Sequence, residues 1–239
     1  MFMDNEYTHL NNDYLCHNPI IRNNGFHLLA ADELNTILHN LVPFERPDMY
    51  AFLGERLVLL EHFEFDASRR TRKGMNGLEK ERRTEEELAQ HKLSQKENLT
   101  KISYPISLEN LVSNFESVYQ GHYRKIDAYV DHARDAGLIS KDETALIGFF
   151  IENRYPPYLE VQLRIHEIAY VQTKQFQQTF LKSPKLDFVL FGCYYESEPQ
   201  IFYVDKESCM ALLQPIDLTD PIIKISHLNE NEVIWNYEI

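Results

Sequence analysis

Apolar residues along this chain of 239 residues recur with two different periods, one typical of strands and one typical of helices. The clearest strand pattern runs from Arg46 to Asp66, where two apolar runs meet at Gly54-Glu55-Arg56 in the manner of a β-hairpin. The second run, Leu57 to Leu60, is entirely aliphatic, as expected of a strand that is covered on both faces. We expect the rest of the fold to be arranged around this hairpin.

Helical spacing predicts several helices around the hairpin. Asp32 has the residue type of an N-cap and precedes the first helical run, which Pro43 follows. Two further helices are expected over 107–119 and 126–136, and a longer one over 159–181. The helix over 126–136 should end at a glycine C-cap, because Gly137 comes next.

Further apolar runs predict the remaining strands. The densest, over 145–151, should be central, while 187–195 and 200–204 should form a second hairpin, with a closing strand over 233–237. The polar, Asn-rich residues 1–27 predict an irregular arm with one short strand near Ile20. Together these elements indicate an α/β fold, a mixed central sheet flanked by helices, with an α+β arrangement as the alternative.

The composition changes after the first hairpin. Residues 69–100 are charged and nearly free of aromatic residues, which predicts a loop and then an exposed helix rich in ion pairs. We therefore divide the chain into three parts of one composite domain. These are an N-terminal part of the core (1–68), a charged loop with a helical insertion (69–138), and a C-terminal part of the core (139–239).

The formal net charge of −13 argues against a protein that coats nucleic acid nonspecifically. The positive charge is concentrated locally, because ten Lys or Arg but six Glu lie between residues 69 and 101. Four of these cations, Arg69, Arg70, Arg72 and Lys73, directly follow the acidic end of the first hairpin. Such an arrangement suits a phosphate-bearing ligand, since a metal ion and the cations would share the phosphate charge.

No apolar run approaches the roughly 20 residues that span a bilayer, and the first residues lack the pattern of a signal peptide. We therefore expect a cytoplasmic protein that does not enter a membrane. The three cysteines agree with this compartment, because no pair of them has metal-ligand spacing and their number is odd.

Candidate chemistry lies where the first hairpin ends. The aliphatic strand continues into Glu61, His62, Glu64 and Asp66, and ionised carboxylates at a buried strand end are costly unless a partner such as a metal ion is present. Asp48 and Glu61 would offer oxygen ligands suited to Mg²⁺ or Mn²⁺. Because side chains alternate along a strand, His62, Glu64 and Asp66 share one face and Glu61 the other. If the apolar face is the core, Glu61 points inward and the other three face solvent.

Three acidic positions follow one another in a recognisable order. Glu33 lies on a predicted helix, Pro47-Asp48 begins a predicted strand, and Glu61 ends the next strand. This order resembles the PD-(D/E)XK nuclease-like superfamily. The resemblance implies a Mg²⁺- or Mn²⁺-dependent nuclease in which Asp48 and Glu61 hold the ion and Glu33 is a further catalytic acid. The superfamily has lysine two residues after the glutamate, whereas Phe63 stands there in this chain. Glu64, or a cation from the loop, would then act on the attacking water.

Two main hypotheses follow from these residues. The first is a metal-dependent endonuclease or exonuclease that cuts phosphodiester bonds of DNA or RNA, with catalytic Asp48, Glu61, Glu64 and Glu33 and with the four loop cations binding phosphate. The second is a catalytically inactive module of the same architecture that binds nucleic acid, or a protein partner through the charged insertion. A regulatory protein of a mobile element is a third reading that the sequence leaves open.

Overall fold

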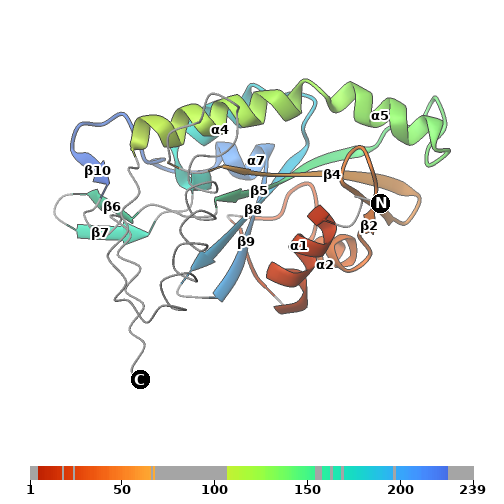
Figure 1. The fold of residues 1–239 in the computed structure, drawn as a ribbon, viewed down its shortest axis with the longest axis horizontal. Helices are drawn as coiled ribbons and strands as arrows, with labels where there is room; N and C mark the ends of the chain where they lie inside the picture. Colours follow the sequence, from red (N-terminus) through yellow and green to blue (C-terminus); the bar gives the residue numbers. More distant parts are fainter. Residues whose placement is uncertain are drawn as a thin grey trace, which may run out of the picture. The chain divides into compact units, whose positions relative to one another are not determined.

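The computed structural model describes residues 5–17, 19–23, 25–65, 67, 107–153, 158–161, 164–167, 170–195 and 198–225. It confirms the expected α/β fold, a mixed seven-stranded sheet with helices (Figure 1). The chain divides into two compact units. The first comprises 1–64, 116–154 and 169–217, and the second comprises 65–115, 155–168 and 218–239.

The large sheet has the strand order β1-β9-β8-β5-β4-β3-β2. Two antiparallel pairs, β3 with β4 and β8 with β9, are the two predicted hairpins, and β5 runs parallel to β8. The turn of the first hairpin contains Gly54 at a φ of 62°, a conformation that glycine adopts without steric cost. The strands are β1 (Ile20–Asn23), β2 (Val42–Pro43), β3 (Met49–Leu53), β4 (Arg56–Phe65), β5 (Leu146–Asn153), β8 (Phe188–Tyr195) and β9 (Glu198–Asp205).

A smaller antiparallel sheet corrects the prediction of one long helix over 159–181. Its strand order is β10-β6-β7, with β6 at Tyr158–Val161, β7 at Arg164–Glu167 and β10 at Ile223–Ile225. Among the described residues of 159–181, the helical ones lie in the last part, as η2 (Tyr170–Gln172) and α6 (Lys174–Leu181). Apolar residues four positions apart lie on one face of a helix and also on one face of a strand, so this spacing could not distinguish the two.

Helices lie on both faces of the large sheet (Figure 1). The short α1 (Asn5–Asp13) and α2 (Ala31–His39) cover one face, and α4 (Leu108–Tyr123) and α5 (Ile126–Asp135) follow the other. A short α7 (Lys206–Met210) comes after β9. Among the described residues, no helix has both the length and the apolar character that crossing a membrane requires.

The predicted irregular arm over 1–27 is wrong over Asn5–Asp13, because these residues form the helix α1. Leu10 of α1 and Tyr14, which directly follows α1, are buried in the core that also contains Leu34 and Ile37 of α2. Two apolar contacts thus stabilise a helix whose polar composition gives little local signal. The strand expected near Ile20 is present as β1.

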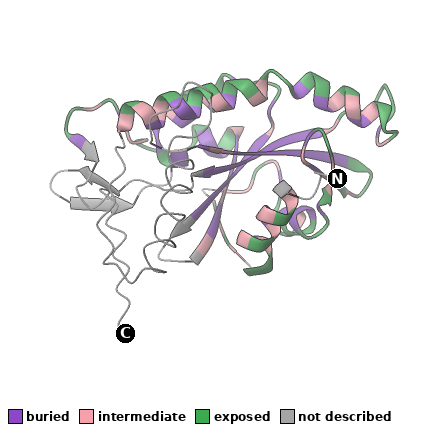
Figure 2. Cartoon of the chain, in the orientation of Figure 1, coloured by how far each residue is buried: buried purple, intermediate pink, exposed green. Residues whose placement is uncertain are grey.

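Strand β4 is buried on both faces over most of its length, as its aliphatic run predicts (Figure 2). Val58 and Leu60 belong to the core cluster formed with α1 and α2. On the opposite face, Phe63 makes edge-to-face ring contacts with Tyr119 of α4 and Phe149 of β5. Alternation along β4 therefore directs His62 toward α1 and Glu61 toward α4 and α5.

Candidate metal centre

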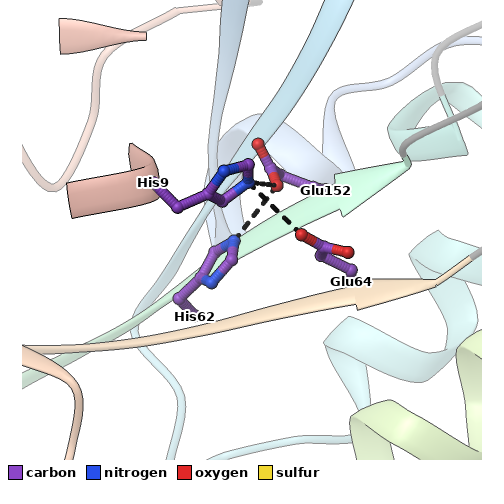
Figure 3. Close-up of side chains that lie close together, drawn as sticks. All are labelled: His9, His62, Glu64 and Glu152. Atoms are coloured by element: carbon purple, nitrogen blue, oxygen red, sulfur yellow. Dashed lines mark hydrogen bonds and ion pairs between the residues drawn. The ribbon is translucent and has the colours of Figure 1, made fainter. Parts of the chain in front are cut away.

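Four side chains from three elements converge on the face of the sheet that α1 covers (Figure 3). His9 comes from α1, His62 and Glu64 come from β4, and Glu152 comes from β5. One nitrogen or oxygen of each side chain lies within 4.8 Å of the corresponding atom of every other. Among the described residues, this is the one group of three or more His, Cys, Asp or Glu side chains with that geometry.

Glu152 is the centre of the cluster. Its Oε2 lies 2.9 Å from His9 Nε2 and 3.2 Å from His62 Nε2. His9 Nε2 also lies 3.3 Å from Glu64 Oε1. The side chains of His62 and Glu152 are 1% and 3% exposed, whereas those of His9 and Glu64 are 21% and 25% exposed. The cluster thus has a buried floor and one side that solvent reaches.

Local structure explains how each side chain arrives at this place. His62 and Glu64 are two residues apart on β4, so they project from the same face of the sheet. Glu152 follows the apolar run of β5, and its neighbour across the parallel pair is Gly192 of β8. A Cβ on Gly192 would lie 2.8 Å from the ring of Tyr14, so the glycine leaves space in which α1 can dock.

His9 and Glu152 each stabilise the charged form of the other. The hydrogen bonds to Glu152 and then to Glu64 raise the pKa of His9 to about 10, although burial acts against this. Burial alone would raise the pKa of Glu152, but the hydrogen bonds with His62 and His9 outweigh it and hold that pKa far below its usual range. The Glu152 carboxylate is therefore ionised at neutral pH.

The donor set fits a divalent transition metal. Two imidazole nitrogens and two carboxylate oxygens suit Zn²⁺, Mn²⁺ or Fe²⁺ better than Mg²⁺, which prefers oxygen ligands throughout. Asp13 Oδ2 lies 3.0 Å from His9 Nδ1, and a carboxylate on the far nitrogen is the usual way in which proteins orient a metal-binding histidine. Protons that now form the hydrogen bonds at Nε2 would leave when an ion binds.

The residues that the sequence singled out are distributed over several places. Glu64 lies in the cluster, whereas Asp48 and Glu61 line a cavity of about 560 Å³ together with His122 and Tyr129. Asp48 Oδ2 accepts a hydrogen bond from the His62 backbone N–H at 2.8 Å. Glu61 Oε1 accepts hydrogen bonds from Tyr129 Oη at 2.5 Å and from His122 Nδ1 at 2.6 Å.

Glu33 has a local role in α2. Its Oε2 accepts a hydrogen bond from the Ala30 backbone N–H at 2.7 Å, which satisfies a donor at the start of the helix. The predicted cations Arg69, Arg70, Arg72 and Lys73, together with Asp66 and the strand expected over 233–237, lie outside the described residues.

Sequence reasoning missed three of the four clustered side chains. His62 stood next to Glu61 but on the face expected to meet solvent, and it is buried because α1 covers that face. Glu152 carried a signal, since it is an acid at the end of a buried strand. His9 carried none, because the residues around it are polar and its docking depends on contacts distant in sequence.

Comparison with known proteins leaves the family resemblance untested. No protein-family model, curated protein or solved structure matches this chain. The resemblance to the PD-(D/E)XK superfamily therefore stays a prediction that rests on Pro47-Asp48 and Glu61.

Proposed function

We propose that this chain is a metal-dependent hydrolase of phosphodiester bonds in nucleic acid, with the ion held by His9, His62, Glu64 and Glu152. The observation that carries the proposal is the convergence of these four side chains within 4.8 Å, two of them almost fully buried. Buried histidines and carboxylates in contact are costly to assemble, so a functional role for the group is favoured over chance.

The residues of the cluster would have different roles. His62 and Glu152, which are buried, would fix the position of the site, while Asp13 orients the ring of His9. Glu64 is partly exposed, so one of its carboxylate oxygens would hold the ion while the other could accept a proton from water at the open side. When bound, a divalent ion would make a water molecule more acidic and neutralise charge on a phosphoryl oxygen.

The substrate class rests on a sequence feature. Arg69, Arg70, Arg72 and Lys73 follow Glu64 by five to nine positions. Several cations this close along the chain to a metal ligand favour a substrate with repeated negative charge, such as DNA or RNA. The donor set favours Mn²⁺ or Zn²⁺ as the ion, whereas the sequence alone led us to expect Mg²⁺ or Mn²⁺.

One observation favours a second candidate, a noncatalytic module with a structural cluster. The hydrogen bonds of Glu152 to His9 and His62 satisfy these groups without any ion. In this case the cluster would tie α1 to the sheet, and the protein would act by binding nucleic acid or a protein partner.

The first experiment asks whether the cluster binds metal. Mn²⁺ and Zn²⁺ are titrated by calorimetry into chelator-treated wild type, His62→Gln, Glu64→Gln and Glu152→Gln, with folding checked by circular dichroism. We expect one ion per chain in wild type and weaker binding in all three variants. His39→Gln changes an exposed histidine outside the cluster and should bind like wild type.

Asp48→Ala separates the two placements of the metal. If the ion lies in the cluster, this variant should lose less affinity than His62→Gln, because Asp48 accepts a hydrogen bond from the His62 backbone but is not one of the four ligands. Loss of binding in Asp48→Ala with retention in His62→Gln would move the ion to Asp48 and Glu61. If wild type bound neither Mn²⁺ nor Zn²⁺, the proposal of a metal-dependent hydrolase would be wrong.

The second experiment asks whether phosphodiester bonds are cut. Single-stranded and double-stranded DNA and RNA are incubated with the metal-loaded protein, and Glu64→Gln is compared with Glu55→Gln, a change in the exposed hairpin turn. We expect cleavage that a chelator abolishes and that Glu64→Gln lowers. Metal binding without cleavage of any of the four substrates would favour the noncatalytic module.

A further inference from the structure

A cavity of about 560 Å³ lies on the face of β4 opposite the metal cluster. Its size falls within the range of pockets that hold small molecules, roughly 300 to 1,000 Å³. Polar residues from the first hairpin and the residue before it, from α4 and α5, and from the turn between these helices line it, namely Glu45, Arg46, Asp48, Glu61, His62, His122, Lys125 and Tyr129. All of them belong to the first compact unit of the chain.

His122 is held rigidly in this cavity. Its Nδ1 donates to Glu61 Oε1 at 2.6 Å, and the same oxygen accepts a hydrogen bond from Tyr129 Oη at 2.5 Å. Its ring stacks on Phe63 with centroids 4.7 Å apart and planes 15° apart. Within the described parts of the chain, no residue forms a hydrogen bond with His122 Nε2. This nitrogen is therefore available to a molecule in the cavity.

The wall carries three acids and two cations, and the two cations can contact a negatively charged group. Asp48 and Glu61 already accept hydrogen bonds, from the His62 backbone and from His122 and Tyr129. The cations Arg46 and Lys125 are exposed and have no ion-pair partner among the residues that the structure describes. Glu45 is the third acid on the wall, and it is exposed to solvent like the two cations, so solvent screens all three charges.

We propose that this cavity binds a small molecule that carries a phosphate or carboxylate group, with Arg46 and Lys125 contacting the anion and the ring of His122 lying beside it. The site needs no metal, and one of the four cluster residues, His62, also lines it. Arg and Lys side chains together suit either anion, because both present oxygens that accept charge-assisted hydrogen bonds.

The test follows the reactivity of His122 in protein kept metal-free with a chelator. Diethyl pyrocarbonate modifies exposed imidazole nitrogens, and peptide mass spectrometry gives the rate at His122. Inorganic phosphate and acetate are the two probes. We expect at least one of them to slow modification of His122 in a saturable way while leaving the rate at exposed His39 unchanged.

Variants connect this protection to the cavity. Arg46→Ala and Lys125→Ala should each raise the half-protecting concentration about tenfold, the effect of losing one charge-assisted hydrogen bond. Lys141→Ala removes an exposed lysine that does not line the cavity and should leave it unchanged. Protection by phosphate alone or acetate alone supports the site and identifies the anion.

Two results would overturn the proposal. One is a His122 rate that neither probe alters. The other is equal protection in wild type, Arg46→Ala and Lys125→Ala, which would mean that the anion acts elsewhere. Because metal is absent throughout, neither result depends on whether the cluster binds an ion or cuts nucleic acid.

Discussion

His9 Nε2 lies 2.9 Å from Glu152 Oε2, although the two residues are 143 positions apart in the chain. The contact joins α1, near the start of the described chain, to the end of β5 in the sheet. It places a histidine and a carboxylate on a largely buried floor with His62, and it makes the position of α1 part of the candidate metal centre.

Removal of the Glu152 carboxylate should strongly destabilise the metal-free protein. Glu152→Ala leaves His62 buried without its acceptor, and breaking a buried pair by removing one partner costs roughly 3 to 5 kcal/mol. Urea denaturation at pH 7 measures the free energy of unfolding. Glu55→Ala, in an exposed turn, is the control and should change that free energy by less than about 0.5 kcal/mol. Equal effects of the two substitutions would show that the buried contacts contribute nothing.

The space beside Gly192 should control both stability and metal affinity. A Cβ there would lie 2.8 Å from the Tyr14 ring and 2.9 Å from the Phe150 ring, so Gly192→Ala should move α1 and cost roughly 1 to 3 kcal/mol. Because His9 is on the same helix, Mn²⁺ or Zn²⁺ should also bind more weakly. Denaturation and metal calorimetry on one preparation measure the two effects.

Gly121 in α4 provides the matched control for that substitution. A Cβ at Gly121 meets no atom within 4 Å, so Gly121→Ala should leave metal binding unchanged and stabilise the helix by up to about 1 kcal/mol. If Gly192→Ala left metal binding and stability unchanged, the predicted steric clash with Tyr14 would be wrong.

Asp205 should account for part of the acid sensitivity of the fold. Its carboxylate accepts hydrogen bonds from the backbone N–H groups of Leu28 at 2.9 Å and Ser208 at 2.8 Å. Burial acts to raise the pKa of Asp205, but hydrogen bonds from Leu28, Ser208 and His27 lower it overall. Since this pKa is lower in the folded state, the stabilisation is present above the unfolded value of 3.8 and is lost as pH falls through the folded value.

Asp205→Asn tests this dependence. The variant should lose roughly 1.5 to 3 kcal/mol at pH 7, where the wild-type carboxylate is ionised, and less at a pH below its folded pKa. Urea midpoints measured between pH 7 and pH 2 give both values. An unchanged difference between wild type and variant over this range would show that the carboxylate charge does not contribute.

The hydrogen bond from Tyr129 to Glu61 should stabilise the folded protein. Tyr129→Phe removes the donor 2.5 Å from Glu61 Oε1, and we expect a loss of roughly 1 to 3 kcal/mol in the free energy of unfolding. A double-mutant cycle with Glu61→Gln measures the coupling between the two side chains. Additive effects in that cycle would mean that the hydrogen bond contributes little to stability. Tyr50→Phe, at a half-buried tyrosine on β3, is the control.

Much of the fold could be predicted from local patterns. The first hairpin, β5, the pair β8 and β9, and the helices α4 and α5 all occur where apolar spacing predicted them. Gly137 has a φ of 72°, as expected after the end of α5. The failures at 159–167 and at α1 occurred where the spacing fitted two structures or where the apolar residues were too few to show a period.

The sequence by itself determined that acidic side chains and a histidine would stand at the end of a buried strand, because alternation and aliphatic runs are properties of neighbouring residues. Only the tertiary structure decided which of them meet. Strand β4 sends His62 and Glu64 to one face and Glu61 to the other, and what each side chain contacts depends on the helix that covers that face. The docking of α1 by Leu10 and Tyr14 brings His9 to Glu152, and contacts between such distant residues leave no period in the sequence.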